Sequence, residues 1–234
     1  MRPFPGCLFL SHDYHGNGPW WQWTVENSHN FHLLAFSGDH VEATDTVSLP
    51  RQTGMVQAVV KLISNSSAWI ALSGGNHDTD VGQAKWLRAI EGKNYVGMGQ
   101  NRVITLRNKA TVVVTSCPDN CTATEETERE IRDLFQQGSE SQGDFWLVLH
   151  HEPPDRGLTC AQAPGSRLLR SLLKQYHPDL VSTGHKHGAP WSKKGGSWTE
   201  TIEQTVVVNA GQKPFRARPC HVTLIGDRFE HHVW

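Results

Sequence analysis

Five short apolar runs along this chain each end in a cluster of histidine, aspartate or asparagine residues. The clearest run is Ala68–Leu72, which is typical of a buried strand and leads into Gly75, Asn76, His77 and Asp78. A sheet holds such a loop rigidly, and an Asn oxygen or a His ring there can bind a metal or, for His, move a proton. The other runs end in segments 12–17, 37–42, 150–154 and 184–187.

Helical patterns separate several of these runs. In Thr53–Ser64, the residues Val56, Val59, Val60 and Ile63 recur at the spacing of one helix face. Strands that alternate with helices predict an α/β fold with largely parallel strands in the first part of the chain. Ligands of such sheets bind beyond the carboxyl ends of the strands, where the polar clusters of this sequence lie.

Patterning divides the whole chain into short elements. We expect further helices after Pro19, over residues 82–91 and 166–176, and after a capping-box pair at Thr122 and Glu125. We expect further strands over residues 7–11, 31–36, 103–106, 111–115, 145–149, 179–182, 205–208 and 221–225. The sequence has no repeat and no low-complexity linker, so we expect a single domain over residues 1–234.

The charge of the chain is nearly balanced, with 22 Lys and Arg residues against 23 Asp and Glu residues. This balance gives no indication of a nucleic-acid or membrane surface. No apolar run approaches the roughly 18 residues of a membrane-spanning helix. The N-terminus also lacks the long apolar segment of a signal peptide. We therefore expect no membrane partner.

Cysteine and histidine usage points to different conclusions. The five cysteines are an odd number at irregular spacing, and the pair Cys117 and Cys121 lacks the second pair of a zinc knuckle. Free thiols in a reducing cytoplasm are the expectation. Fourteen histidines are many for 234 residues, and histidine is the commonest metal ligand. The histidine-rich strand ends therefore favour a metal site.

The candidate ligands indicate a metal site only when they are considered together. A single His or Asp at a strand end is more often a cap or a surface residue. Oxygen donors mixed with imidazoles suit Mn²⁺, Fe or Zn²⁺ rather than a thiolate zinc site. The candidates are too many for one tetrahedral ion and suit two metals that share a carboxylate. They are Asp13, His15, Asp39, Asn76, His151, His185 and His187.

In their order and composition these clusters resemble those of the calcineurin-like metallophosphoesterases, a superfamily of dinuclear metal phosphatases and phosphodiesterases. The pattern of that family is Asp-x-His, Gly-Asp, Gly-Asn-His-Asp/Glu, a single His and Gly-His-x-His. The matching blocks here are Asp13-Tyr14-His15, Gly38-Asp39, Gly75-Asn76-His77-Asp78, His151 and Gly184-His185-Lys186-His187. The resemblance covers about residues 7–190, and residues 208–211 are similar to the closing strand and turn of the family.

The resemblance implies a fold and an activity. The fold is a four-layer αββα sandwich, in which two facing mixed β-sheets are flanked by helices. The activity is hydrolysis of a small-molecule phosphoester. A phosphodiester is preferred over a phosphomonoester, because the chain is short, lacks protein-phosphatase features and is similar to small bacterial-type phosphodiesterases.

The resemblance also implies two metal positions that share Asp39. The first is held by Asp13, His15, Asp39 and His187. The second is held by Asp39, Asn76, His151 and His185. Two cations roughly 3.5–4 Å apart would activate a bridging water, and the resulting hydroxide would attack phosphorus. His77 would not be a ligand. It would stabilise the developing charge or protonate the leaving oxygen as general acid.

This sequence departs from the family pattern near Asp39. The family often has an Asp three residues after the bridging carboxylate, where it orients the catalytic His. Here that residue is the longer Glu42, and Asp78 is the alternative carboxylate for the same task. Ala43 replaces the Arg of protein Ser/Thr phosphatases, which argues against that branch. We expect structural or surface roles for His12 and His40, which flank ligand positions.

Two adjacent histidines compete for one ligand position. The family places this ligand two residues before a proline, which selects His151 over His150 because Pro153 follows. We expect His150 to pack rather than to reach the substrate.

Several aromatic and basic residues could have either a substrate-binding or a structural role. Trp20, Trp21 and Trp23 could stack a nucleobase, but filling the space between helix and sheet is the favoured role. The cations Lys193, Lys194, Arg216 and Arg218 could steer an anionic substrate, but solvated charge is the default.

Two other functions fit the same fold. A nuclease acting on DNA or RNA would need a basic or aromatic track, of which the neutral composition gives little sign. A non-catalytic scaffold would have lost ligands or the catalytic His, and this chain keeps them all.

Overall fold

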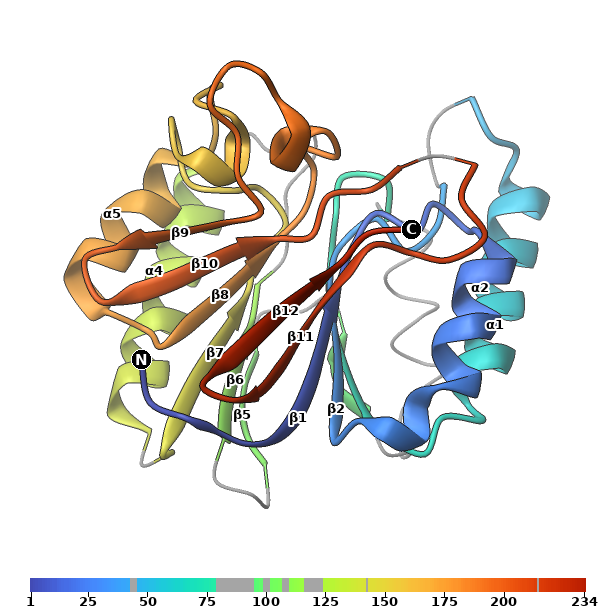
Figure 1. Ribbon diagram of the computed structural model, residues 1–234, viewed down its shortest axis with the longest axis horizontal. Coiled ribbons are helices and arrows are strands. Elements are labelled where there is room, and N and C mark those ends of the chain that lie inside the picture. Colours follow the sequence, from blue (N-terminus) through green and yellow to red (C-terminus); the bar gives the residue numbers. More distant parts are fainter. Residues whose placement is uncertain are drawn as a thin grey trace.

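The computed structural model describes residues 1–42, 46–78, 95–98, 102–106, 110–115, 124–141, 143–213 and 215–234. Two β-sheets face each other, with helices α1 and α2 on one outer side and helices α4 and α5 on the other (Figure 1). This arrangement confirms the αββα sandwich that the family resemblance implied.

The first sheet has the order β12-β11-β1-β2-β3-β4. Strands β1 to β4 are parallel, while β11 runs antiparallel to β1 and to β12. The carboxyl ends of β1, β2 and β3 therefore lie at one edge of the sheet. The strands are β1 (Phe4–Ser11), β2 (Leu33–Ser37), β3 (Trp69–Ser73), β4 (Tyr95–Met98), β11 (His221–Gly226) and β12 (Arg228–His232).

The second sheet has the order β5-β6-β7-β8-β10-β9. Its four inner strands are parallel, and β5 and β9 pair antiparallel at its edges. The buried Ser37 hydroxyl donates to the Ser182 hydroxyl at 2.7 Å, which joins the end of β2 to β8 across the two sheets. The strands are β5 (Arg102–Thr105), β6 (Ala110–Val114), β7 (Phe145–Leu149), β8 (Leu180–Thr183), β9 (Thr199–Ile202) and β10 (Thr205–Asn209).

The helices are α1 (Gly18–Glu26), α2 (Leu49–Ile63), α4 (Glu125–Glu140) and α5 (Arg167–Tyr176), with short 3₁₀ turns η1 (Ser28–Asn30), η3 (Leu158–Cys160) and η4 (Ala189–Trp191). The capping box expected at Thr122 is wrong. The cap of helix α4 is Thr124, two residues later, whose side chain accepts from the backbone N–H of Thr127. Thr122 itself lies outside the described residues.

Trp20 and Trp21 belong to the apolar core beneath α1 and α2, as expected. Their exposed fractions are 4% and 0%, and the ring of Trp21 lies 4.8 Å from that of Phe36 on β2. Trp23 is half-buried and packs against the same cluster. A second cluster fills the space between the sheets, including Leu10 of β1. These tryptophans therefore hold α1 against the sheet.

Some expectations concern residues that the structure does not describe. These are the helix over 82–91 and the thiols of Cys117 and Cys121. Cys7, Cys160 and Cys220 are free thiols, and the cytoplasmic location inferred from cysteine usage stays a prediction. No helix within the described ranges is both long enough and apolar enough to cross a membrane.

Replacing Trp21 tests its assignment to the core. Trp21→Ala should lower the free energy of unfolding by about 3–5 kcal/mol, the usual cost of truncating a buried large aromatic side chain. Urea denaturation measures this value. Trp69→Ala is the matched control, because Trp69 is 38% exposed at the start of β3 and should cost clearly less. Equal losses in the two variants would contradict the assignment.

Candidate metal centre

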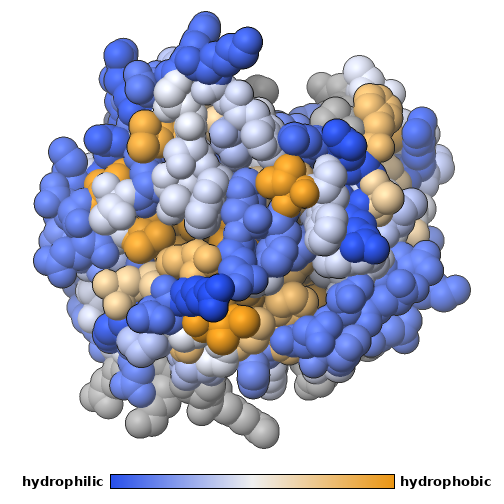
Figure 2. Space-filling view, in the orientation of Figure 1, coloured by the Kyte–Doolittle hydropathy of each residue, from blue (hydrophilic) through white to orange (hydrophobic). Residues whose placement is uncertain are grey.

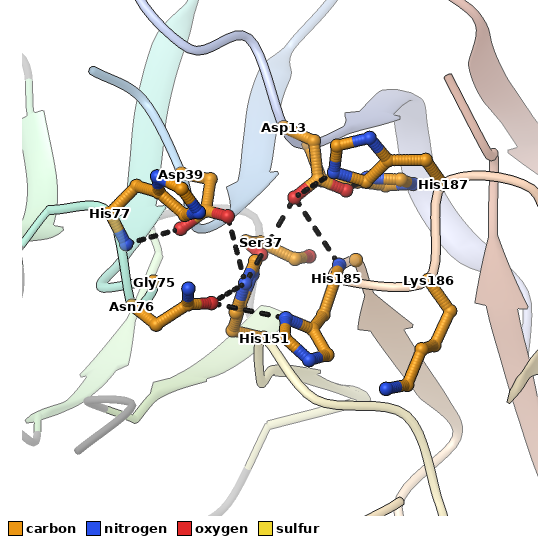
Figure 3. Close-up of polar contacts among 12 residues, drawn as sticks. Asp13, Ser37, Asp39, Gly75, Asn76, His77, His151, His185, Lys186 and His187 are labelled. Atoms are coloured by element: carbon orange, nitrogen blue, oxygen red, sulfur yellow. Dashed lines mark hydrogen bonds and ion pairs between the residues drawn. The ribbon is translucent and has the colours of Figure 1, made fainter. Parts of the chain in front are cut away.

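The polar clusters that follow β1, β2, β3, β7 and β8 meet at one edge of the sandwich. Figure 3 shows side chains that converge from both sheets, namely Asp13, Asp39, Asn76, His151, His185 and His187. The Nδ1 atom of His151, after β7, lies 2.7 Å from the backbone oxygen of Ser37 at the end of β2. All seven sequence-predicted ligands are brought to this edge, which lies where ligands of parallel sheets bind.

The backbone turns sharply where the clusters begin. Asp13, His15, Asp39 and His185 all have a left-handed conformation, with φ values of 54°, 45°, 54° and 62°. Such a conformation costs a residue with a side chain roughly 1–2 kcal/mol. Two hydrogen bonds hold the turns after β1 and β2 together, from Asp13 N to Gly38 O (3.0 Å) and from His15 N to Asp39 O (2.9 Å). Strain of this kind is typical of functional sites.

Two glycines allow the loops to approach closely. Gly38 has a φ of 91°, and a Cβ atom there would collide with the His151 ring. A Cβ atom on Gly75 would collide with the carboxylate and the backbone nitrogen of Asp39. Only glycine therefore lets His151 and Asp39 occupy their observed positions.

One group of candidate ligands combines the ends of β1, β2 and β8. The ligand atoms of its four residues lie within 4.8 Å of one another. The Nε2 atom of His187 lies 3.4 Å from Asp13 Oδ1 and 3.3 Å from His15 Nε2. His15 Nε2 lies 3.9 Å from Asp39 Oδ2. The four residues are Asp13, His15, Asp39 and His187.

A second group shares Asp39 with the first. Ligand atoms of Asp39, His151 and His185 lie within 4.8 Å of one another, and His151 Nε2 is 3.2 Å from Asp39 Oδ2. The side-chain oxygen of Asn76 lies 3.0 Å from both His151 Nε2 and His185 Nδ1. Asp39 therefore belongs to both groups of candidate ligands, and its bridging role stays a prediction.

The carboxylates of this cluster are buried yet stay ionised. Burial alone raises the pKa of Asp13, but the His12 and His187 rings hold that pKa well below its usual value. Burial also raises the pKa of Asp39, and His151 more than offsets this effect. In turn, Asp39 and Asp13 raise the pKa of His151 to about 10, against the lowering effect of burial. The site is therefore built to hold positive charge.

This donor set fits metal ions. Carboxylate and amide oxygens combined with imidazole nitrogens suit Mn²⁺, Fe or Zn²⁺. The far ring nitrogen of His151 contacts a backbone oxygen, which is the usual way to orient a histidine ligand. The geometry does not distinguish among these metals.

His77 and Glu42 lie side by side at the edge of the cluster. The Nδ1 atom of His77 is 2.7 Å from Glu42 Oε1, and the backbone N–H of His77 donates to Asp39 Oδ1 at 2.8 Å. The other oxygen of Glu42 lies 2.9 Å from His15 Nδ1. The rings of His15 and His77 are perpendicular, with centroids 4.7 Å apart. Glu42 thus touches both a candidate ligand and the candidate acid.

Asp78 faces the backbone instead of His77. Its carboxylate is buried and accepts hydrogen bonds from the N–H groups of His40 (2.8 Å), Val41 (3.0 Å) and Gly75 (3.0 Å). Asp78 therefore fastens the loop after β2 to the loop after β3. Of the two carboxylates left open by the sequence, Glu42 is the one in contact with the His77 side chain.

The neighbouring histidines pack, as expected. His150 is buried, with Nδ1 2.8 Å from the Thr115 hydroxyl, and burial lowers its pKa to about 4. His12 is buried against the Asp13 carboxylate. Nε2 of His40 lies 2.6 Å from Ser73 O.

Sequence reasoning missed one residue that supports the site. Gln212 is 4% exposed, and its side-chain NH₂ donates to the backbone oxygen of His12 at 2.8 Å. Its backbone N–H donates to His187 O at 3.0 Å. Its position directly after the segment 208–211, which resembles the closing turn of the family, is the signal that could have drawn attention to it.

The sequence of this chain is similar to that of a known family. A sequence model of the calcineurin-like phosphoesterase family matches residues 12–189. No protein with a curated description is significantly similar in sequence.

Solved structures show the same fold at low identity. A dimetal phosphatase from Danio rerio is 9% identical, with a TM-score of 0.65 over 99% of this chain and 96% of that one. The TT1561 protein of Thermus thermophilus is 14% identical, with a TM-score of 0.64 over 99% of both chains. A purple acid phosphatase from yellow lupin is 12% identical, with a TM-score of 0.60 over 95% of this chain and 50% of its own.

Filling the space at Gly75 should disturb the metal centre. We expect Gly75→Ala to weaken metal binding about 10–100-fold, the usual cost of disturbing a ligand's support. Equilibrium dialysis followed by elemental analysis measures the affinity. Gly54→Ala is the control, because a Cβ atom there meets open space on α2. Unchanged affinity in Gly75→Ala would contradict the geometry described for Asp39.

Proposed function

Because this chain belongs to the calcineurin-like phosphoesterase family, we propose that it hydrolyses a small-molecule phosphodiester at a dinuclear metal centre, with His77 as general acid. The observation that carries the proposal is the pair of ligand groups that share Asp39, with the His77 ring beside them. The family implies a hydrolase of phosphoric esters, while the diester, the acid and the ligand roles are our proposals.

We assign the ligands by their groups. Asp13, His15, Asp39 and His187 would hold one metal ion. Asp39, Asn76, His151 and His185 would hold the other. When bound, the two ions would supply a nucleophile from water and offset the negative charge of the phosphate oxygens.

We propose that His77 moves a proton and is not a metal ligand. Its backbone N–H is tied to Asp39, and Glu42 lies at its Nδ1 atom. With Nδ1 so oriented, Nε2 is left to donate a proton to the leaving oxygen. Asp78 would act only as a positioning residue, because it fixes the backbone of His40 and Val41 just before Glu42.

The retained residues argue against a scaffold. All seven proposed ligands and His77 are present and converge at one edge. A protein that had lost catalysis would be free to lose them. The preference for a diester rests on Ala43, which stands where protein phosphatases have Arg.

A substrate panel tests the proposed reaction. Metal-loaded protein should hydrolyse bis(4-nitrophenyl) phosphate with a higher kcat/KM than 4-nitrophenyl phosphate. Stripping with a chelator should abolish both activities, and reloading should restore them. Equal rates in stripped and loaded protein would refute metal-dependent hydrolysis. A higher kcat/KM on the monoester would refute the diester preference, and faster cleavage of single-stranded DNA would favour the nuclease alternative.

Replacing His77 separates acid catalysis from metal binding. We expect His77→Ala to keep its metal content and to lose about 100-fold or more in kcat on a diester with an alkyl leaving group. The loss should be smaller with a nitrophenolate leaving group, which needs little protonation. His29→Ala, an exposed histidine on η1, is the control. Loss of metal in His77→Ala would identify His77 as a ligand, and equal losses on both substrates would exclude the acid role.

A further inference from the structure

The loop between β10 and β11 crosses from the second sheet to the first sheet and reaches the α1 side of the molecule (Figure 1). Gln212 closes its base, because the Gln212 side-chain oxygen accepts from Cys220 N at 3.1 Å. The same residue bonds the backbone oxygens of His12 and His187. The loop is therefore anchored to the backbone of two segments that carry proposed metal ligands.

The far part of the loop spans the two segments that follow His15 and His187. The Lys213 ammonium lies 4.7 Å from the ring centroid of Trp191, which belongs to η4 after His187. The backbone oxygen of Arg216 accepts from the indole N–H of Trp20, on α1 after His15, at 2.7 Å. Since His15 and His187 lie together in the cluster, the loop borders that side of the metal centre.

Phe215 is an unusual residue at the tip of this loop. It is fully exposed, at 102%, and has a left-handed backbone with a φ of 64°. Isolated exposed apolar residues are common. A bulky side chain held in this conformation is uncommon and carries a cost in strain. The loop that borders the metal centre therefore carries a bare phenyl ring, which can stack on a flat ring.

Three basic residues flank Phe215 in this loop. Lys213, Arg216 and Arg218 lie within six residues, and the Arg218 guanidinium lies 4.8 Å from the ring of Trp234. Among the described residues, the ion pairs of Lys and Arg side chains involve none of these three cations. Three cations this close in one loop create a positive potential that attracts anions. Figure 2 shows apolar atoms beside strongly hydrophilic residues at the upper right, where Figure 1 draws this loop.

We propose that Lys213 and Phe215–Arg218 form a subsite for the part of the substrate that is not cleaved. The phenyl ring takes up a flat ring, and the cations take up a second anionic group. The substrate class is thus a nucleotide-like phosphoester with a further negative charge. This assignment deepens the proposed function, on which it rests.

Equilibrium binding to the metal-loaded full chain tests the subsite. The probes are ribose 5-phosphate, adenosine 5′-monophosphate and adenosine 3′,5′-bisphosphate, each as a phosphonate that resists hydrolysis, with Kd measured by calorimetry. The adenine ring should tighten binding about fivefold or more, the lower range of stacking on an aromatic side chain. The second anionic group should add a further gain of about fivefold or more, and this gain should shrink as salt rises.

Two variants separate the two contributions. Phe215→Gly should reduce the gain from the ring to less than about twofold and keep the gain from the second anionic group. Its melting temperature should not fall, because Gly adopts a φ of 64° without strain. The double variant Lys213→Gln with Arg216→Gln should lose the second gain and keep the first. Ile225→Ser and Lys174→Gln, which remove an exposed apolar group and an exposed cation elsewhere, should change neither.

Several results would overturn the subsite. The subsite would be contradicted if, in the wild-type protein, neither the adenine ring nor the second anionic group lowered the Kd. It would also be contradicted if Phe215→Gly weakened the binding of all three probes equally. Tighter binding of a short oligothymidylate or of phosphatidylglycerol vesicles, lost in Phe215→Gly, would replace the small-molecule assignment. Failure of the proposed function is distinct: a protein that keeps both gains but hydrolyses no nitrophenyl ester would have the subsite without the activity.

Discussion

The structure depends on the burial of two carboxylates at the ends of adjacent parallel strands. Asp13 and Asp39 lie almost out of contact with water, and each adds negative charge to the other's surroundings. Removing such ions from water costs several kcal/mol each unless positive charge is close. The imidazoles that converge from the second sheet, His151 and His187, meet this need in part, and bound cations would meet it fully. The buried carboxylates of the first sheet therefore require the second sheet to face them, because that sheet supplies the nearby positive charge.

Some residues of the loops around this centre hold the backbone in place, and others contact the side chains proposed to act in the reaction. The left-handed turns at Asp13 and Asp39 aim the carboxylates inward, and backbone hydrogen bonds between the loops hold them there. The Asp78 carboxylate accepts hydrogen bonds from backbone N–H groups, whereas the Glu42 carboxylate contacts the side chains of both His15 and His77. The longer side chain of Glu42, compared with the Asp common in the family, allows one carboxylate to touch both rings.

The sequence predicted the strand ends because each polar cluster follows an apolar run, and the order of the blocks indicated the family. The layering of the fold came from that resemblance, since periodicity alone supports only an α/β class. Other features depend on contacts between distant residues, which local patterns do not encode. The choice between Glu42 and Asp78 depends on loop direction, and the bond of Gln212 to His12 joins residues 200 positions apart. The start of α4 was misplaced because Thr122 and Thr124 are both plausible caps, and only the observed bond to Thr127 distinguishes them.

The most direct test of this account is the number of metal ions that one chain binds. Stripped protein titrated with Mn²⁺ or Zn²⁺ should bind two ions per chain, because two ligand groups share Asp39. Asp39→Asn should weaken both sites, whereas Asp227→Asn, an exposed carboxylate on the turn after β11, should leave two ions bound. Saturation at one ion per chain, or two tightly bound ions in Asp39→Asn, would contradict a dinuclear centre bridged by Asp39.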